Sequence, residues 1–440
     1  MIERRGFLAG AAATLAWTAA SDALASSARG MDSAQVLRTW YRMVLELVRH
    51  TPTYSPPVAS RAFAYLGVTA HEAAASGSAG LRSLAGQLNG LEPFPARTAG
   101  TAYDDALVLH TALADSVRHF FGNTGPTGQR AMASLGTKLR AKAAAGLPAE
   151  IVARSEAFGA AVAAHVVAWS AGDGGANVEN MGFPLSYALG DTPGRWTPTS
   201  LIAQQQAPLL PRWGENRGFA MPSGASCGIA PPPPYSEQEG SAFFAEAREV
   251  HEVSRSLDGE QRAIARFWSD DPMLSPTPPG HWIAIALQIL KREEAGLEHS
   301  VEVLARLGAA LADSFIACWH SKYEFDLLRP VTFIRRHIDP QWEPLLITPP
   351  FPEYPSGHST QSGAAAVVLS QAFGEDFAFE DATHEDDGLP TRAYPSFWAA
   401  AEEAALSRLY GGIHFRAAVE RGLEQGRCVG AYAVALRMRR

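Results

Sequence analysis

The sequence has 440 residues, of which 47% are hydrophobic and 19% are charged, which indicates a globular protein with material for a large buried core. The formal net charge of −8 excludes a general nucleic-acid binder, so any site for an anion must be a local basic pocket. The three cysteines, Cys227, Cys318 and Cys428, are far apart and form no CxxC pair. Their spacing predicts small buried residues rather than a zinc site or a disulfide framework.

Residues 1–25 have the features of an export signal. Arg4 and Arg5 precede an apolar stretch that runs to about Ala20, and the Ala-Leu-Ala that follows is typical of a cleavage site. The stretch is too short to span a bilayer comfortably, and Arg-Arg-x-Phe-Leu resembles the twin-arginine type of signal. A disordered basic tail would explain the arginines but not the Ala-rich stretch. We therefore expect a bacterial protein that is exported to the periplasm or secreted, with no membrane anchor once the signal is removed.

Helical periodicity dominates the rest of the chain, and alternating strand patterns are scarce. Apolar residues that repeat at three- and four-residue steps predict helices near 34–50, 58–76, 102–122, 127–146, 148–171, 236–256, 258–269, 280–293, 297–320, 358–373, 396–411 and 414–438. The predicted fold is all-α and of the helical-bundle type. We divide it into an N-terminal helical half, 26–171, and a C-terminal helical catalytic half, 236–440. The oligomeric state stays open, a homo-oligomer included.

Residues 172–235 interrupt the helical pattern. They are rich in Gly, Pro, Trp and Ser and end in four consecutive prolines, which is typical of irregular structure. A flexible linker is one interpretation. Trp196 and Trp213 favour the other, a loop that packs over the helices.

The first candidate cluster is KYEFDLLRP, which places Lys322 and Arg329 seven positions apart. On a helix this spacing is two turns, so the two cations would share one face. The alternative is a solvated basic edge in which Asp326 pairs with Lys322.

The second cluster lies in PPFPEYPSGHST, residues 349–360. Pro355 sets its φ for a first helical turn, Ser356 offers a hydroxyl, and Gly357 lets its amide approach a ligand closely. Free amides at a helix start bind anions, so His358 would lie beside an anion. The alternative is an ordinary helix start with a surface histidine.

The third cluster is SRLYGGIHFRAAVERG. Arg408 can bind an oxyanion with a planar fork of donors, and Gly411 and Gly412 break the helix so that His414 can turn into a pocket. A plain corner between two helices, with a structural histidine, is the alternative. Together the three clusters would form a complete cage for a tetrahedral or trigonal-bipyramidal oxyanion, with a general acid/base and a nucleophile or ligand.

The order of these motifs resembles the vanadium-dependent haloperoxidases and the related type 2 phosphatidic acid phosphatases. Lys-x6-Arg-Pro, Pro-Ser-Gly-His and Ser-Arg-x5-His follow one another over roughly residues 315–430. The resemblance implies the helical-bundle fold of the haloperoxidases and acid phosphatases. It also implies that vanadate or phosphate occupies the cage.

The resemblance assigns the cationic and amide donors of that cage. Lys322, Arg329 and Arg408 would donate to the equatorial oxygens, and Ser356 and the Gly357 amide would complete the cage. The positive charge, that of Lys322 included, would draw electron density away from a bound peroxide.

The two histidines take different roles in the same resemblance. His358 would be the acid/base residue. His414 would bind vanadium axially in a peroxidase, or carry the phosphoryl group in a phosphatase. Phe351 would form part of the halide-pocket wall, at a position where fungal chloroperoxidases also carry Phe, which hints at chloride.

The implied activity is the oxidation of halide by hydrogen peroxide with vanadate as cofactor, which gives hypohalous acid or an equivalent halogenating species for a small organic acceptor. The lack of further spanning helices, the long helical half before the motifs and the expected export favour this activity over a phosphatase. A non-catalytic oxyanion-binding protein is the third alternative.

One position departs from the family pattern. Family members usually carry an aspartate four residues after the ligand histidine, where it orients the ring, but this chain has Ala418 there. Glu420 would point to a different helical face. Asp326 or an acidic residue of the segment 380–388 could take the role from elsewhere, and without such a partner vanadate affinity would be weaker.

Three other polar features are given plain interpretations. The pair His71-Glu72 lies on a predicted helix without a second histidine at metal spacing, so we expect a structural role. His281 in TPPGHW is a minor candidate for the pocket wall. The acidic run 380–387 is expected to be a solvated loop, because it lacks a calcium-loop pattern.

Overall fold

The computed structural model describes residues 32–177, 183–184, 186–200 and 207–440, so the predicted export signal lies outside the described residues. The helices of the N-terminal half are α2 (Ser33–Arg49), α3 (Pro56–Ala75), α4 (Asp105–Phe120), α5 (Pro126–Ala143) and α6 (Ala149–Ser170). Those of the C-terminal half are α7 (Ala242–Ser256), α8 (Gly259–Phe267), α9 (Thr277–Arg292), α10 (Leu297–Phe325), α11 (Pro330–His337), α12 (Gly357–Phe373), α13 (Phe397–Tyr410) and α14 (Arg416–Val434). The described strands, β1 (Phe379–Asp381) and β2 (Arg392–Tyr394), form one antiparallel pair.

The predicted all-α fold is confirmed, and every predicted helix overlaps an observed one. The start of α2 shows why the pattern works. The Asp32 carboxylate caps the helix by accepting from the Gln35 amide, and a stripe of buried apolar residues from Val36 to Leu47 faces the core. The short helix α11 was not predicted, because with eight residues it is too short for the apolar periodicity to stand out.

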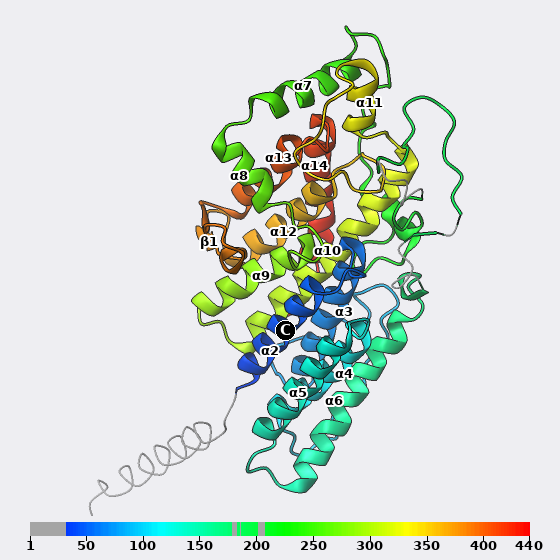
Figure 1. Ribbon diagram of the computed structural model, residues 1–440. Helices are drawn as coiled ribbons and strands as arrows, with labels where there is room; N and C mark the ends of the chain where they lie inside the picture. Colours follow the sequence, from blue (N-terminus) through cyan, green and yellow to red (C-terminus); the bar gives the residue numbers. More distant parts are fainter. Residues whose placement is uncertain (1–31, 178–182, 185, 201–206) are drawn as a thin grey trace, which may run out of the picture.

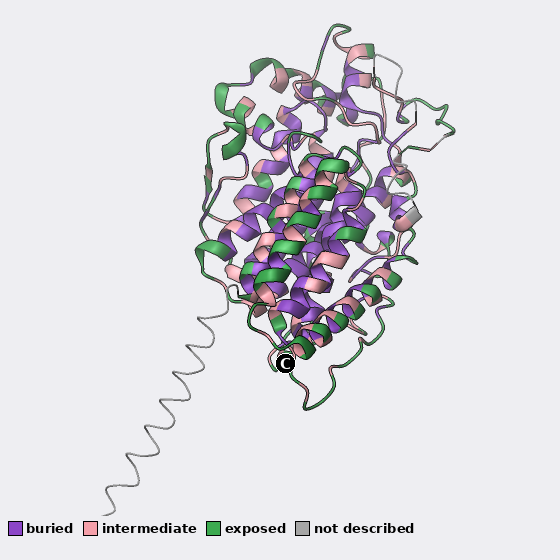
Figure 2. Ribbon diagram, turned by 60° about the horizontal axis from the view of Figure 1, so that its bottom comes forward, coloured by how far each residue is buried: buried purple, intermediate pink, exposed green. Residues whose placement is uncertain are grey.

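Helix α10 connects the two halves of the molecule. Figure 1 shows α2 to α6, in blue and cyan, gathered on one side of α10, with α12 to α14, in orange and red, on the other. Along its length α10 packs against α3, α12 and α14. Buried residues are concentrated in the central helices, whereas the exposed residues lie on the outer faces (Figure 2).

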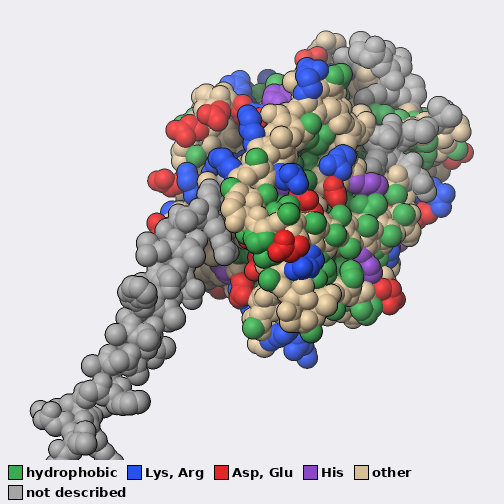
Figure 3. Space-filling view, turned by 90° about the horizontal axis from the view of Figure 1, so that it is seen from below, with side chains coloured by type: hydrophobic (Ala, Val, Ile, Leu, Met, Phe, Trp, Pro, Cys, Tyr) green, Lys and Arg blue, Asp and Glu red, His purple; other side chains and the backbone are tan. Residues whose placement is uncertain are grey.

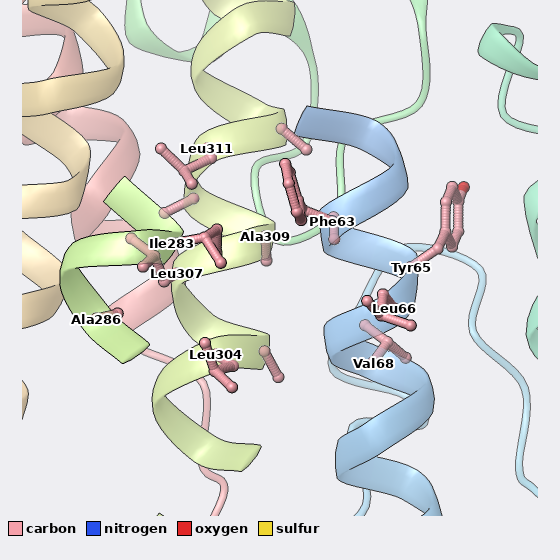
Figure 4. Close-up of a cluster of buried hydrophobic side chains, with 14 of the residues drawn as sticks. Phe63, Tyr65, Leu66, Val68, Ile283, Ala286, Leu304, Leu307, Ala309 and Leu311 are labelled. Atoms are coloured by element: carbon pink, nitrogen blue, oxygen red, sulfur yellow. The ribbon is translucent and has the colours of Figure 1, made fainter. Parts of the chain in front are cut away.

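The crossing of α3 and α10 depends on two glycines. A Cβ added at Gly67 would lie 2.8 Å from the Cα of Ala305, and one at Gly308 would lie 3.0 Å from the Cα of Ala64. Only residues without a side chain allow the two backbones to come this close. Next to this crossing, Phe63 and Leu66 of α3 and Leu304 and Leu307 of α10 form part of the buried apolar cluster (Figure 4).

We expect Gly308→Val to destabilise the protein by roughly 1–3 kcal/mol, because the added side chain would force the two backbones apart. The free energy of unfolding, from denaturant titration, would measure it. Gly240→Ala is the matched control, since no atom lies within 4 Å of the Cβ it adds. Equal stability of the two variants would contradict this account of the crossing.

The described part of 172–235 contacts α10. It contains three short 3₁₀ turns, η1 (Gly175–Asn177), η2 (Trp213–Glu215) and η3 (Gly224–Cys227), and Trp196 and Trp213 are both buried. The expectation for the cysteines was wrong in one respect. Cys227 of η3 forms a disulfide with Cys428 of α14, 201 residues later in the chain, while Cys318 is free and buried. Tertiary packing, which the spacing does not reveal, brings the pair together.

Helix α6 is an exception to the prediction that no long apolar segment follows the signal. Among the described helices it alone is long and apolar enough to cross a membrane, with 22 residues and a mean hydropathy of 1.4. It packs against α4 through a stripe that includes Phe158, Val162 and Val166, which is also typical of a helix in a bundle. On the face in Figure 3, the basic and acidic side chains that the structure describes are interspersed.

His71 and Glu72 have the structural role that we expected. His71 is fully buried and its Nε2–H donates to the carbonyl of Arg82, while the Glu72 carboxylate accepts from the Leu84 amide and the Ser83 hydroxyl. These bonds fix the chain that follows α3.

Burial of His71 should make the fold sensitive to acid. Burial lowers the pKa of His71 to about 4, so the unfolded chain takes up this proton below its ordinary value while the folded chain does not. The stability that neutral His71 contributes is therefore lost as the pH falls below about 6.5. Between pH 7 and 5 we expect the wild type to lose about 2 kcal/mol more of its unfolding free energy than His71→Gln. Equal losses of unfolding free energy in the wild type and in His71→Gln would contradict this prediction.

Candidate functional site

Lys322 and Arg329 do not share a helix face, contrary to prediction. α10 ends at Phe325 because Asp326 takes a left-handed conformation, with φ of 48°. Arg329 is the N-cap residue of α11, where the proline that follows it sets the helix start. The Asp326 carboxylate lies 3.9 Å from Arg195, and the described contacts do not pair it with the Lys322 ammonium; the Asp326 amide instead donates to the Lys322 carbonyl. Lys322 and Arg329 are nevertheless both fully buried.

Lys322 holds the backbone that precedes α12. Its Nζ donates to the carbonyls of Pro352 (2.8 Å), Glu353 (2.9 Å) and Pro355 (2.6 Å). An ammonium has three protons, so none is left for an oxyanion in this arrangement. Burial lowers the pKa of Lys322 to about 7. Lys322 therefore lies near His414 and His358, but it donates to backbone carbonyls and not to a bound oxyanion as we predicted.

Arg329 reaches the same region from the start of α11. Nε donates to the carbonyl of Phe351 and Nη1 to that of Ile413, both at 2.9 Å. Nη1 also lies 3.2 Å from His414 Nε2. Nη2 is buried and has no hydrogen-bond partner in the structure. A buried donor of this kind requires a partner, and an anion oxygen would supply one.

Glu353 orients His414, and this corrects our expectation for Asp326. Glu353 Oε1 lies 2.8 Å from His414 Nδ1 and also accepts from the amide of Phe415, at 2.9 Å. Because Arg329 can only donate, His414 Nε2 must be the acceptor of their contact, and Nδ1 carries the proton that is donated to Glu353. This tautomer leaves the Nε2 lone pair available to a metal. Burial lowers the pKa of His414 well below its ordinary value, so the ring is neutral.

Ala418, which stands where the family pattern has aspartate, lies where α14 packs against the start of α12. Ala418 is fully buried, and its carbonyl accepts from the amide of Ser356. Glu420 faces Arg416 instead, at 3.9 Å. The role expected of Asp326 or of the segment 380–388 is therefore filled by a carboxylate from the chain before α12.

His358 lies in the first turn of α12. Ser356 is the N-cap residue, and its hydroxyl accepts from the amide of Ser359. His358 Nε2 is buried, has no hydrogen-bond partner and lies 4.0 Å from Asp270 Oδ2. Burial first, and then the charge of Arg408, lower the pKa of His358 well below its ordinary value. The interpretation as a surface histidine is excluded, and a neutral ring can accept a proton.

Arg408 and His414 are joined by the predicted break between α13 and α14. α13 ends at Tyr410, and Gly412 takes a positive φ of 75° that favours glycine. Arg408 Nε donates to the hydroxyl of Ser407, and its Nη2 donates to the carbonyl of Trp268. Burial lowers the pKa of Arg408 to about 10, so the guanidinium stays charged at neutral pH.

A cavity of about 510 Å³ brings the predicted residues together. Its polar lining includes Gly357, His358, Arg408, His414, Asp270 and Asp271. Phe351, the predicted halide-pocket wall, lines it with Phe315 and Trp319. At its mouth, Leu274 and Ile347 are 68% and 83% exposed. Lys322, Arg329 and Ser356 are not among its lining residues, but Arg329 contacts His414, which is.

Comparison with known proteins identifies the family. Residues 302–440 match the family model described as the VCPO second helical-bundle domain. The vanadium chloroperoxidase of Curvularia inaequalis is 28% identical over 217 residues, covering 36% of this chain and 36% of that protein. The crystal structure of the first bacterial vanadium-dependent iodoperoxidase is 38% identical, with a TM-score of 0.84, covering 92% of this chain and 96% of that chain. The chain belongs to the vanadium-dependent haloperoxidases.

Other relatives of this haloperoxidase share its fold. The holo-type structure of a bacterial vanadium-dependent chloroperoxidase is 19% identical with a TM-score of 0.66, covering 88% of this chain and 94% of that chain. The helical-bundle haloperoxidase fold predicted from the motifs is thus confirmed. In the fungal chloroperoxidase, by contrast, the chain spans only about a third of the relative's length.

The residues of this haloperoxidase fit vanadate, the cofactor that its family implies. Arg329 Nη2 and His358 Nε2 are buried without partners, and the lone pair of His414 Nε2 lies beside Arg329. Two unpaired polar atoms next to a neutral imidazole suit an oxyanion of a metal that takes one nitrogen ligand. His414 would hold the metal, and Arg329, Arg408 and the start of α12 would hold its oxygens.

Sequence reasoning missed several residues of the site. Glu353 lies in PPFPEYPSGHST, the segment that also contains His358. It is the one acidic residue among the prolines of this segment, and this could have marked it as a site residue. Asp270, which faces His358, has no motif. His281 does not line the cavity, contrary to our minor expectation, but contacts Asp270. The segment 380–387 is not simply solvated, because Asp381 within it is fully buried.

Proposed function

We propose that this haloperoxidase oxidises halide with hydrogen peroxide while vanadate is bound at His414. The observation that best supports this proposal is the tautomer of His414. Glu353 contacts one ring nitrogen and Arg329 the other, and together they fix which nitrogen carries the proton. A neutral imidazole whose Nε2 is unprotonated, beside the buried guanidinium of Arg329, is what a metal oxyanion requires.

In the proposed reaction, halide, hydrogen peroxide and one proton give hypohalous acid and water. The O–O bond breaks, an oxygen–halogen bond forms, and the halide loses two electrons to the peroxide. The chemistry that bound vanadate supplies is the activation of peroxide toward the halide.

The chain's own residues hold the reactants and move the proton. Arg329 Nη2, Arg408 and the amides at the start of α12 would donate to oxygens in the site. His358, which is neutral, would accept a proton from hydrogen peroxide as it enters and return it to the oxygen that leaves as water. Lys322 would act through its charge and through the backbone that it holds.

We propose iodide as the preferred halide and a small apolar molecule as the organic acceptor. Iodide is the most easily oxidised of the halides, and the 38% identical relative is an iodoperoxidase. The apolar cavity mouth at Leu274 and Ile347 supports access by an apolar acceptor. Phe351, which hinted at chloride, also fits a wall beside a large, weakly hydrated anion.

One assay tests the proposed function. The purified protein is freed of vanadate, titrated with orthovanadate, and assayed for peroxide-dependent oxidation of iodide, bromide and chloride beside hydrolysis of a chromogenic phosphate ester. We expect halide oxidation that depends on vanadate, fastest with iodide. Ester hydrolysis that vanadate inhibits would instead identify a phosphatase, and failure of both reactions would identify a non-catalytic binder.

We propose that the protein is exported through its twin-arginine-type signal. The Arg4-Arg5 pair and the disulfide, a bond that is rare in the reducing cytosol, support this. In a bacterial host the processed form should accumulate outside the cytoplasm. Replacing both arginines by lysine should leave the precursor inside, and unchanged export would contradict the proposal.

A further inference from the structure

A second group of buried polar residues lies behind His358. Asp270 follows α8, His281 is in the second turn of α9, and His384 follows β1, so the three come from separate parts of the chain. One ligand atom from each lies within 4.8 Å of the other two. Each side chain is buried, and Asp270 takes a positive φ of 50° that places its carboxylate between the two rings.

The two histidines are oriented as metal ligands are. His281 Nδ1 lies 3.0 Å from both carboxylate oxygens of Asp270, and its Nε2 lies 2.8 Å from Asp381. His384 Nε2 lies 3.3 Å from Asp270 Oδ1, and its Nδ1 lies 2.9 Å from Asp387. A carboxylate on the far nitrogen of each ligating histidine is a recurrent feature of zinc sites, because it fixes the tautomer and strengthens the ligand.

One of these ring nitrogens has no hydrogen bond. His384 is only 5% exposed, and its Nε2, which faces Asp270, makes no hydrogen bond despite being buried. Asp381 is fixed in turn by the amide and hydroxyl of Thr383, so its place beside His281 is well defined. This nitrogen lies 3.3 Å from Asp270 Oδ1 without the geometry of a hydrogen bond, so a cation at the centre of the group would give it a better-directed partner.

The charges and distances at this point also suit a cation. Asp270 and Asp381 are buried carboxylates on opposite sides of the His281 ring. In a tetrahedral zinc site with ordinary bond lengths, neighbouring ligand atoms are about 3.3 Å apart. The separations of 3.0 and 3.3 Å around Asp270 are close to this value, and the ligand atoms of the two histidines lie within 4.8 Å of each other.

We propose that Asp270, His281 and His384 form a binding site for a divalent transition-metal ion, of which zinc fits best. Two imidazoles and one carboxylate are ligands that zinc prefers, and three protein ligands leave a fourth position for water. The ion would tie together the loop after α8, helix α9 and the segment after β1. Because Asp270 also faces His358, the ion would lie directly behind the proposed acid/base residue.

Metal content tests this proposal without any halide, peroxide or vanadate, so its failure is distinct from failure of the proposed function. The tag-free full chain is freed of metal with a chelator, dialysed against excess Zn²⁺, washed and analysed for bound zinc. We expect one equivalent to be retained. Co²⁺ in its place should give the strong visible absorption of a tetrahedral site.

Three variants localise the ion. His384→Gln should retain less than about a tenth of an equivalent, because a ligand is lost. Asp387→Asn keeps all three ligands and should weaken zinc binding about 10–100-fold. His320→Gln is the control, since His320 is partly exposed on α10 and reports adventitious binding to surface histidines.

Two results would overturn the proposal. Wild-type protein that retains no zinc would show that the group is a hydrogen-bonded network in which protonated His281 is the cation. Equal zinc retention by wild type and His384→Gln would place the ion elsewhere. If His384→Gln does not fold, as judged by circular dichroism, the test passes to Asp387→Asn. Unchanged zinc affinity in that variant would also place the ion elsewhere.

Discussion

A His358→Ala variant should lose a factor of about 10²–10⁴ in kcat for halide oxidation, the range that general acid/base groups contribute. His358 lines the cavity with Arg408, and its Nε2 has no hydrogen-bond partner, whereas alanine can neither accept nor return the proton of hydrogen peroxide. Vanadate affinity should change by less than about tenfold, because His414 and the guanidinium donors remain. Steady-state kinetics at saturating vanadate, with equilibrium dialysis of vanadate, separates the two effects.

His50→Ala is the control for this variant, since His50 is an exposed residue at the end of α2. It should match the wild type in both measurements. A kcat within threefold of wild type for His358→Ala would show that the proton takes another route, and Asp271, which also lines the cavity, would be the next residue to test.

A Glu353→Gln variant should bind vanadate about 10–100-fold more weakly than the wild type. Glutamine can still accept from His414 Nδ1, but its amide oxygen is a weaker acceptor than the carboxylate, so the imidazole becomes a weaker donor through Nε2. Glu353→Ala removes the hydrogen bond as well and should bind still more weakly. Equilibrium dialysis of vanadate measures the affinity.

A second measurement tests the tautomer itself. Nitrogen-15 spectra of the vanadate-free protein should show His414 protonated at Nδ1 in the wild type, and a mixture of tautomers in Glu353→Ala. Glu343→Gln is the control, because Glu343 is exposed and its carboxylate lies near Arg335 rather than His414. Unchanged vanadate affinity in both Glu353 variants would mean that Arg329 alone orients the ring.

The sequence predicted those parts of the fold that depend on residues close together in the chain. Amphipathic spacing located the helices, and the glycine pair after Tyr410 located the break that releases His414. The motifs brought Gly357, His358, Arg408 and His414 to one cavity because each lies at the start or end of a helix, where short-range signals are strong.

The errors concern single residues whose effect is not local. The left-handed conformation of Asp326 ends α10 and separates Lys322 from Arg329, but periodicity continues through the segment. Glu353 lies five residues before His358 in the chain, yet its partner is His414, and no spacing rule connects them. The Cys227–Cys428 bond likewise depends on how the loop region packs on α14.

Helix α10 has a consequence for how the protein unfolds. Its early turns cross α3, and its last turn carries Lys322, which holds the chain before α12. Neither half can therefore melt while the other keeps its core, because both would lose the same helix. Heat should remove the oxyanion cavity and the N-terminal bundle in one cooperative step, so loss of activity reports on the whole chain.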